Sequence, residues 1–148
     1  MSPPTYIYKI LPASAAPPSP LPDALPVSEL DSSDGFIHLS TALQIPGTLK
    51  QFFSHEDSVY ILRIVYAKVE KDIKWENDKG EGKPKCYQTV AKTYLDVSGG
   101  VGEENMFPHL YNGLRLGSAE IESIVEWNWN DGWEAAINKA TNDSWFMY

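Results

Sequence analysis

The sequence has little cysteine, no long apolar run and no excess of positive charge. Cys86 is the only cysteine among 148 residues, so the chain can form no internal disulfide and has no cysteine pair to bind a metal. No apolar stretch approaches the roughly 18 residues of a membrane-spanning helix. The N-terminal residues lack the basic start and apolar stretch of a secretory signal. We therefore expect a cytoplasmic protein in a reducing compartment.

The charge is strongly acidic, because 12 lysines and arginines stand against 20 aspartates and glutamates, a net charge of −8. Proteins that bind nucleic acids generally need a basic patch to displace counterions from phosphates. An acidic chain is also repelled by anionic lipid surfaces. The composition thus predicts neither a nucleic-acid partner nor a membrane partner, and no pattern in the sequence indicates an oligomeric state.

Length and composition are typical of one globular domain covering residues 1–148. Hydrophobic residues make up 43% of the chain and charged residues 22%, as in ordinary globular proteins. A chain of this size buries about 68–70% of the surface that its unfolded form exposes. That is enough for one hydrophobic core without disulfides or metal ions.

Proline divides the chain unevenly, since eight of its 11 prolines lie between Pro3 and Pro26. Proline fixes φ and lacks a backbone donor, so residues 12–26 cannot form a helix or a central strand. We expect a proline-rich arm on the surface. Residues 79–105 are rich in glycine and charge and are expected to be a loop-rich insertion. Residues 31–35 have the composition of a turn.

Apolar alternation predicts a β-rich scaffold with two helices. The strongest strand is expected at residues 59–66, which are apolar enough for a central position. Other strands are expected at residues 5–11, 35–40, 73–76, 107–111 and 120–129.

Thr41 and Gln44 form a capping box ahead of a helix over residues 46–53, with Leu49, Phe52 and Phe53 buried. Asp131 and Glu134 are expected to cap a final helix that ends near residue 140, with Trp133, Ile137 and Ala140 on one face. The aromatic tail at residues 145–148 is expected to pack onto the body or to form an interface.

Two pentapeptides, residues 36–40 and 107–111, share the pattern Phe-x-His-Leu-hydroxyl. Alternate side chains of a strand point to opposite faces. Each strand should therefore carry a phenylalanine, a histidine and a hydroxyl on one face: Phe36, His38 and Ser40 on the first, Phe107, His109 and Tyr111 on the second. The residues between them, Ile37, Leu39 and Leu110, are expected in the core.

Histidine titrates near neutral pH and is the usual general acid or base. His38 and His109 are therefore candidate catalytic residues on rigid strands. The alternative interpretation is two structural histidines that hydrogen-bond within the core. His55 lies in a polar turn and is expected to be solvated. The pattern alone leaves both interpretations open.

Other catalytic signatures are absent from the sequence. No phosphate-binding GxxxxGK[ST] loop, GxGxxG fingerprint or GxSxG elbow occurs. Cys86 has no histidine nearby in the sequence to activate it. A metal ion needs at least three ligands, and only a tertiary approach of His38, His109 and Glu76 would supply them. We predict no metal site.

Residues 34–53 (DGFIHLSTALQIPGTLKQFF) and 107–114 (FPHLYNGL) resemble an uncharacterised family called domain of unknown function 952. The opening strand YIYKIL and the pair Trp75-Glu76 also fit its pattern. The resemblance implies a fold similar to that of ADP-ribosyltransferases. This is an α+β domain built around a split, mostly antiparallel sheet with few helices.

The same resemblance implies a cleft that holds NAD or a related nucleotide. Lys9 stands where such enzymes carry a first-strand histidine or arginine. Three residues, His38, Ser40 and Thr41, resemble the hydroxyl-bearing second strand, and His109 and Tyr111 lie on a third. Glu76 is the candidate for the acidic residue. His38 and His109 are then expected to be catalytic and the other five to bind ligand.

Three functions compete at this point. The first is a nucleotide-related enzyme or binder in which both histidines contact ribose or phosphate and Tyr111 stacks on a ring. The second is a two-histidine phosphodiesterase, for which His38 and Ser40 fit the required His-x-Ser motif while Tyr111 replaces the second small hydroxyl. The third is a non-enzymatic interaction domain that presents the proline-rich arm and the aromatic tail. The first two require both imidazoles at the rim of one cleft.

Overall fold

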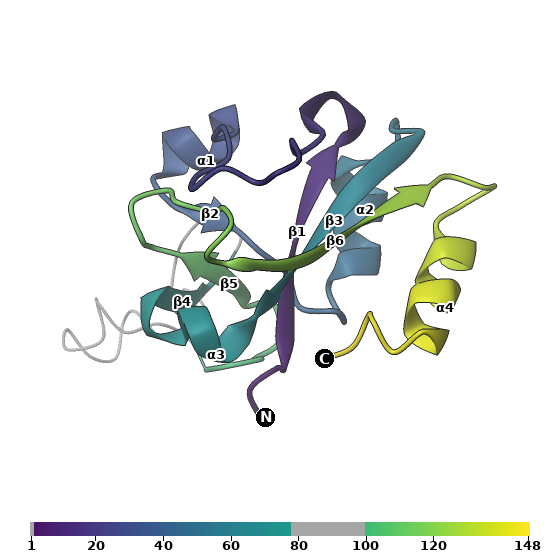
Figure 1. Ribbon diagram of the computed structural model, residues 1–148. Helices are drawn as coiled ribbons and strands as arrows, with labels where there is room; N and C mark the ends of the chain where they lie inside the picture. The colour runs from purple at the N-terminus through teal and green to yellow at the C-terminus, as the bar shows by residue number, and fades with distance from the viewer. Residues whose placement is uncertain (1, 78–99) are drawn as a thin grey trace.

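The computed structural model describes residues 2–77 and 100–148 (Figure 1). Most of the expected insertion at residues 79–105, with Cys86, lies outside the described residues. Within the described residues, no helix is long and apolar enough to cross a membrane. The fold is α+β, and residues 2–77 and 100–148 contain two antiparallel sheets of three strands each.

The first sheet contains the long strands of the molecule in the order β1-β3-β6. Its strands are β1 (Tyr6–Pro12), β3 (Ser58–Val65) and β6 (Ile121–Asn128). The apolar β3 is the central strand, as its composition predicts, because both of its faces are covered by core residues. The strands predicted at residues 5–11, 59–66 and 120–129 are confirmed to within one or two residues.

The second sheet is smaller and has the order β2-β5-β4. It contains β2 (Ile37–His38), β5 (Phe107–Leu110) and β4 (Ile73–Glu76). The strand predicted at residues 35–40 is shorter than expected, because its end changes partner. Ser40 leaves the second sheet and exchanges two backbone hydrogen bonds of 2.8 and 2.9 Å with Tyr8 of β1. This bridge links the two sheets.

Two hydrophobic clusters cover opposite faces of the first sheet. One lies between the sheets and includes Ile37, Leu39 and Leu110, which confirms the predicted core-facing side of both pentapeptides. The other lies under α2 (Ile45–Phe52), α4 (Glu134–Asn142) and the C-terminal tail. Figure 1 accordingly shows the small sheet and α4 on opposite sides of the long strands. The connection after β3 forms α3 (Tyr66–Val69) and the 3-10 turn η2 (Glu70–Asp72).

The turn predicted at residues 31–35 is instead the body and end of a short helix, α1 (Glu29–Asp34). Ser28 caps its first turn by accepting a hydrogen bond from the backbone N–H of Asp31. Gly35 ends it with φ 80°, a left-handed conformation that glycine adopts without strain. The glycine-aspartate composition therefore marked the end of a helix.

Two further details of the helices differ from expectation. Phe52 was expected in the core but is 57% exposed, because α2 has only one narrow buried face, built on Ile45 and Leu49. At α4, Trp133 occupies the capping position, and Asp131 lies in the preceding turn with φ 54°. The buried face of α4 is as predicted, since Trp133 and Ala140 are buried.

The proline-rich segment crosses the surface after the 3-10 turn η1 (Ala13–Ala15) and is fastened at its far end. Leu25 is buried, and its backbone N–H donates to the carbonyl of Leu116 at 2.8 Å. Gly117 lies directly against the backbone of Asp23, where a side chain would clash. The C-terminal tail packs onto the body as predicted, with Phe146 buried beside Tyr8.

Candidate functional site

The two histidines of the repeated pattern are direct cross-strand partners. β2 and β5 are antiparallel, and their register pairs His38 with His109. Their ring centroids lie 5.1 Å apart, and the ring of Phe36 stacks on His109 at 4.2 Å. The geometry follows from the alternation of side chains along both strands. Sequence reasoning thus placed both rings on matching faces, and the sheet register brings them together.

The predicted position at a common rim holds for His38 but is wrong for His109. The side chain of His38 is 23% exposed, whereas only 1% of the His109 side chain is exposed. The reason is position in the sheet: β5 is the central strand, with β2 on one side and β4 on the other. His109 therefore lies at the bottom of the site and His38 at its entrance.

His38 lies between two aspartates of α1. Its Nδ1 is 2.6 Å from Oδ1 of Asp31, and its Nε2 is 3.0 Å from Oδ2 of Asp34. A carboxylate only accepts hydrogen bonds, so Nδ1 donates to Asp31, while the Asp34 carboxylate lies within ion-pair distance of Nε2. The ring orientation of His38 is therefore fixed by the helix above it.

Asp31 is the centre of this group. Besides the imidazole, it accepts hydrogen bonds from Nζ of Lys9 at 2.7 Å and from the backbone N–H of His38 at 3.2 Å. Burial by itself would raise the pKa of the Asp31 carboxyl. The hydrogen bonds from His38 and Lys9, together with the lysine charge, more than offset this effect and hold that pKa below its ordinary value. Asp31 is thus a buried carboxylate stabilised by two basic side chains.

His109 belongs to a second group, formed with Glu76 of β4 and Tyr111. Nδ1 of His109 lies 3.0 Å from Oε1 of Glu76, and the phenol of Tyr111 donates to the same oxygen at 2.7 Å. Because a carboxylate cannot donate, this arrangement places a proton on Nδ1 and leaves Nε2 of the neutral ring with a lone pair. A carboxylate-oriented imidazole of this kind can act as a proton acceptor.

The pKa shifts of this second group follow from burial. Desolvation lowers the pKa of His109, and the nearby His38 lowers it further, against the opposing effect of Glu76. Desolvation also raises the pKa of the Tyr111 phenol, and the hydrogen bond to Glu76 adds to that shift. Near neutral pH the site therefore holds a neutral His109 and a protonated Tyr111.

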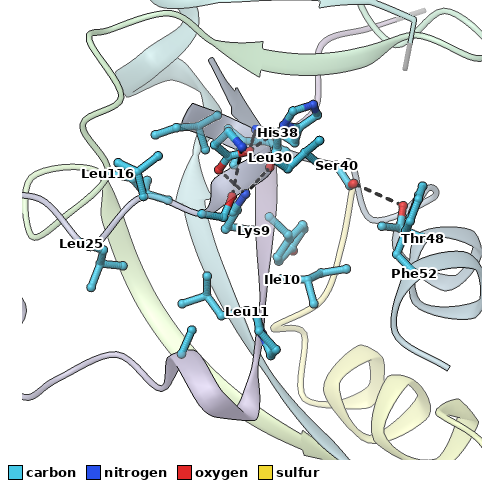
Figure 2. Close-up of a pocket in the computed structure, with 18 of the residues that line it drawn as sticks. Lys9, Ile10, Leu11, Leu25, Leu30, His38, Ser40, Thr48, Phe52 and Leu116 are labelled. Atoms are coloured by element: carbon cyan, nitrogen blue, oxygen red, sulfur yellow. Dashed lines mark hydrogen bonds and ion pairs between the residues drawn. The ribbon is translucent and has the colours of Figure 1, made fainter. Parts of the chain in front are cut away.

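A cavity of about 600 Å³ lies beside the two histidines (Figure 2). Its walls come from β1, the end of the proline-rich arm, α1, β2, α2 and β5. Figure 2 shows Lys9 and His38 close together on one side and the Ser40–Thr48 hydrogen bond on another, with leucine and isoleucine side chains between and below them. Ligand sites usually have this size and a mostly apolar wall with a few polar groups.

The structure divides the seven residues predicted for the site into three sets. Lys9, His38, Ser40 and His109 line the cavity. Glu76 and Tyr111 lie behind His109 and reach the cavity only through that ring. Thr41 is buried and donates its backbone N–H to the side chain of Gln44 at 3.0 Å, so it belongs to the start of α2.

Sequence reasoning missed Asp31 and Asp34, which fix the position of His38. A signal for them exists in the sequence. Ser28-x-x-Asp31 is the pattern of a helix start, and Gly35 follows as a typical helix end. A helix between these two residues places Asp31 and Asp34, three positions apart, on one face. The contact with His38, however, depends on tertiary structure.

A model of a family described as "protein of unknown function (DUF952)" matches residues 21–124. The chain belongs to this family. The matched region contains α1, both histidine-bearing strands and β4, so the two histidine groups lie within it apart from Lys9. The family resemblance seen in residues 34–53 and 107–114 is thereby confirmed, while the similarity to ADP-ribosyltransferases remains a prediction.

Solved structures of the protein CC0527 from Caulobacter crescentus are similar to this chain. The X-ray structure has a TM-score of 0.61 at 23% identity and covers 90% of this chain and 99% of that chain. The solution NMR structure has a TM-score of 0.55 at 24% identity and covers 86% and 90%, respectively. Similarity at this level of identity supports the fold alone. No curated protein matches the chain.

Proposed function

We propose that this protein binds a small ring-containing molecule of the nucleoside or NAD-related class in the cavity, where His38 and His109 contact its polar groups. The observation that carries the proposal is the position of two cross-strand imidazoles, 5.1 Å apart, in the wall of a cavity of about 600 Å³. The apolar wall suits a ring, and the lone pair on Nε2 of His109 can accept a hydrogen bond from a hydroxyl or N–H group.

The nucleotide class comes from the family resemblance, and the geometry supports part of it. Lys9, Ser40 and both histidines line one cavity although they come from three strands and the segment that bridges two of them. Glu76 and Tyr111 orient His109 from behind, in the way that outer residues commonly fix a ligand-binding imidazole. A neutral His109 facing a bound ring is also suited to accept a proton from it.

Isothermal titration calorimetry with adenosine, ADP-ribose and NAD tests the proposal. We expect saturable heat from at least one of the three, and at least a tenfold loss of affinity in His38→Gln and His109→Gln. His55→Gln is the matched control, because His55 is 75% exposed and does not line the cavity. Its affinity should equal that of the unaltered protein.

Because His109 is buried, the variant His109→Gln is prone to unfolding. Circular dichroism must therefore accompany the titrations. Leu30→Glu provides a second variant for the same titrations. Leu30 lines the cavity but is 58% exposed, so its replacement should leave the fold intact and lower the affinity for the ligand. Heat from none of the three ligands, in protein shown to be folded, overturns the proposal. Equal losses in His38→Gln and His55→Gln would overturn it as well.

The phosphodiesterase hypothesis remains a second candidate because both imidazoles lie in the wall of one cavity. Two histidines that face one bound phosphate can serve as base and acid. His109 has the neutral form required of a base. Hydrolysis of a 2′,3′-cyclic nucleotide that is lost in both His38→Ala and His109→Ala would support this candidate over simple binding. If the unaltered protein does not hydrolyse the cyclic nucleotide, the phosphodiesterase hypothesis is wrong.

A further inference from the structure

The basic group in the cavity wall is already neutralised. Among the described residues that line the cavity, Lys9 is the only lysine or arginine. Its Nζ donates to Asp31 at 2.7 Å and to the carbonyl of His38 at 3.2 Å. Asp34 contributes a second carboxylate to the same wall. The charge of Lys9 is thus balanced by Asp31, and an anion that displaced Asp31 would leave a buried carboxylate without its partner, which is strongly unfavourable.

The mouth of the cavity is formed by exposed apolar side chains. Val27, Leu30 and Phe52 all line the cavity, and they are 41%, 58% and 57% exposed, respectively. They come from the end of the arm, from α1 and from α2. Three large apolar side chains gathered at one opening are unusual on a free surface and are stabilised when a ligand covers them.

The open edge of β1 adds polar groups that carry no charge. The backbone N–H and C=O of Tyr8 point away from β3 and form hydrogen bonds with the backbone of Ser40. Backbone groups alternate in direction along an antiparallel strand, so Ile10, two residues further on, directs its own N–H and C=O to the same edge. Ile10 lines the cavity, and within the described residues it has no backbone partner across that edge. These groups can bond an amide, a hydroxyl or a ring nitrogen.

Resting on the proposed binding function, we infer that the cavity takes an uncharged, largely apolar ring system and holds any phosphate of a nucleotide outside in solvent. Burial of the ring against the leucine and isoleucine wall supplies the attraction. The backbone N–H and C=O of Ile10 supply hydrogen bonds. The Lys9–Asp31 pair stays closed, so a negative charge gains no free partner inside.

Two fluorescent probes with the same aromatic rings test this inference. N-phenyl-1-naphthylamine is uncharged, and 8-anilino-1-naphthalenesulfonate adds one sulfonate. Both brighten when they leave water. We expect one-to-one, saturable binding of the uncharged probe, at least tenfold tighter than that of the sulfonate.

Two leucines provide matched variants. Leu30→Glu places a carboxylate at the mouth of the cavity and should lower the affinity for the uncharged probe at least tenfold. Leu43→Glu is the control, because Leu43 is 68% exposed but does not line the cavity. Asp34→Asn removes one negative charge from the wall. It should raise the affinity for the sulfonate probe and so reduce the difference in affinity between the two probes.

The outcomes separate this inference from the proposed function. Sulfonate binding as tight as that of the uncharged probe, or tighter, contradicts the inference but leaves a ligand-binding cavity in place. Equal effects of Leu30→Glu and Leu43→Glu also contradict it, because the probe would then bind elsewhere. Tight uncharged-probe binding without heat from adenosine, ADP-ribose or NAD supports the inference and overturns the nucleotide class proposed above.

Discussion

His38 and His109 occur in the same five-residue pattern and face each other across two strands, yet their surroundings differ in exposure and charge. His38 lies near the surface between two carboxylates of α1. His109 lies buried on the central strand, oriented by one carboxylate that also accepts from Tyr111. A repeated pattern fixed the direction of both rings, but the neighbouring elements determined their chemistry.

This difference assigns separate tasks to the two rings. His38, with a carboxylate at each nitrogen, is held in place and donates from Nδ1 to Asp31. His109, whose pKa burial lowers, stays neutral and can accept a proton. The contrast comes from the different burial and the different carboxylate neighbours of two like rings. It can be tested from either side.

The largest effect should come from removing the buried carboxylate on the His38 side. Asp31→Ala leaves the Lys9 ammonium, only 11% exposed, without its partner and also removes the contact with His38. Loss of one member of a buried ion pair costs about 3–5 kcal/mol in the free energy of unfolding. Urea denaturation followed by circular dichroism measures it.

Asp34→Ala is the control for this variant, since Asp34 contacts the same imidazole but its side chain is 36% exposed. An exposed pair contributes about 0–1 kcal/mol. Equal destabilisation by the two variants would show that Asp31 is not the centre of the group, and would contradict the account of His38 given above.

An intermediate effect is expected on the His109 side. Glu76→Leu removes the acceptor of a buried donor, His109, and of a half-buried donor, Tyr111. The unsatisfied buried donor of His109 costs about 1–3 kcal/mol, whereas Tyr111→Phe removes a donor and should cost about 1 kcal/mol. The same urea measurement compares them. A larger loss in Tyr111→Phe than in Glu76→Leu would mean that the carboxylate does not connect the two side chains.

The smallest effect is a pH dependence that distinguishes the histidines. The pKa of His109 is lower in the folded state than the ordinary 6.5. Between these two values the unfolded chain binds a proton that the folded chain does not. The free energy of unfolding therefore falls as pH decreases through this window and is fully retained above 6.5.

His109→Gln should flatten this slope, and His55→Gln should leave it unchanged because His55 is 75% exposed. Asp31 contributes separately at lower pH: its lowered pKa means that its stabilisation is lost only as pH falls below the ordinary 3.8. A slope near pH 6 that survives His109→Gln would contradict a buried, neutral His109.

Local patterns in the sequence predicted the strands and the face that each histidine occupies. Alternation is a property of the strand itself, so the directions of His38 and His109 required no knowledge of distant residues. The central position of β3 followed in the same way from its apolar run. The tail was also correctly expected to pack onto the body, because four consecutive large residues at 145–148 are costly to expose.

Features that depend on contacts between residues distant in the sequence could not be predicted from local patterns. Asp31 meets Lys9 and His38 only after α1 folds over β2, so the contacts could not be predicted even where the capping residues mark the helix. The burial of His109 depends on β4 joining the far side of β5. Phe52 was expected inside, but α2 buries only the face of Ile45 and Leu49 and leaves Phe52 exposed at the cavity mouth.

The central claim is that the two imidazoles lie against each other in one cavity wall. Two-dimensional NMR of the imidazole ring protons tests it directly, since the chain has only three histidines. We predict a nuclear Overhauser cross-peak between the rings of His38 and His109, and a shift of both signals, but not of His55, when N-phenyl-1-naphthylamine is added. Absence of that cross-peak in folded, assigned protein would contradict the account.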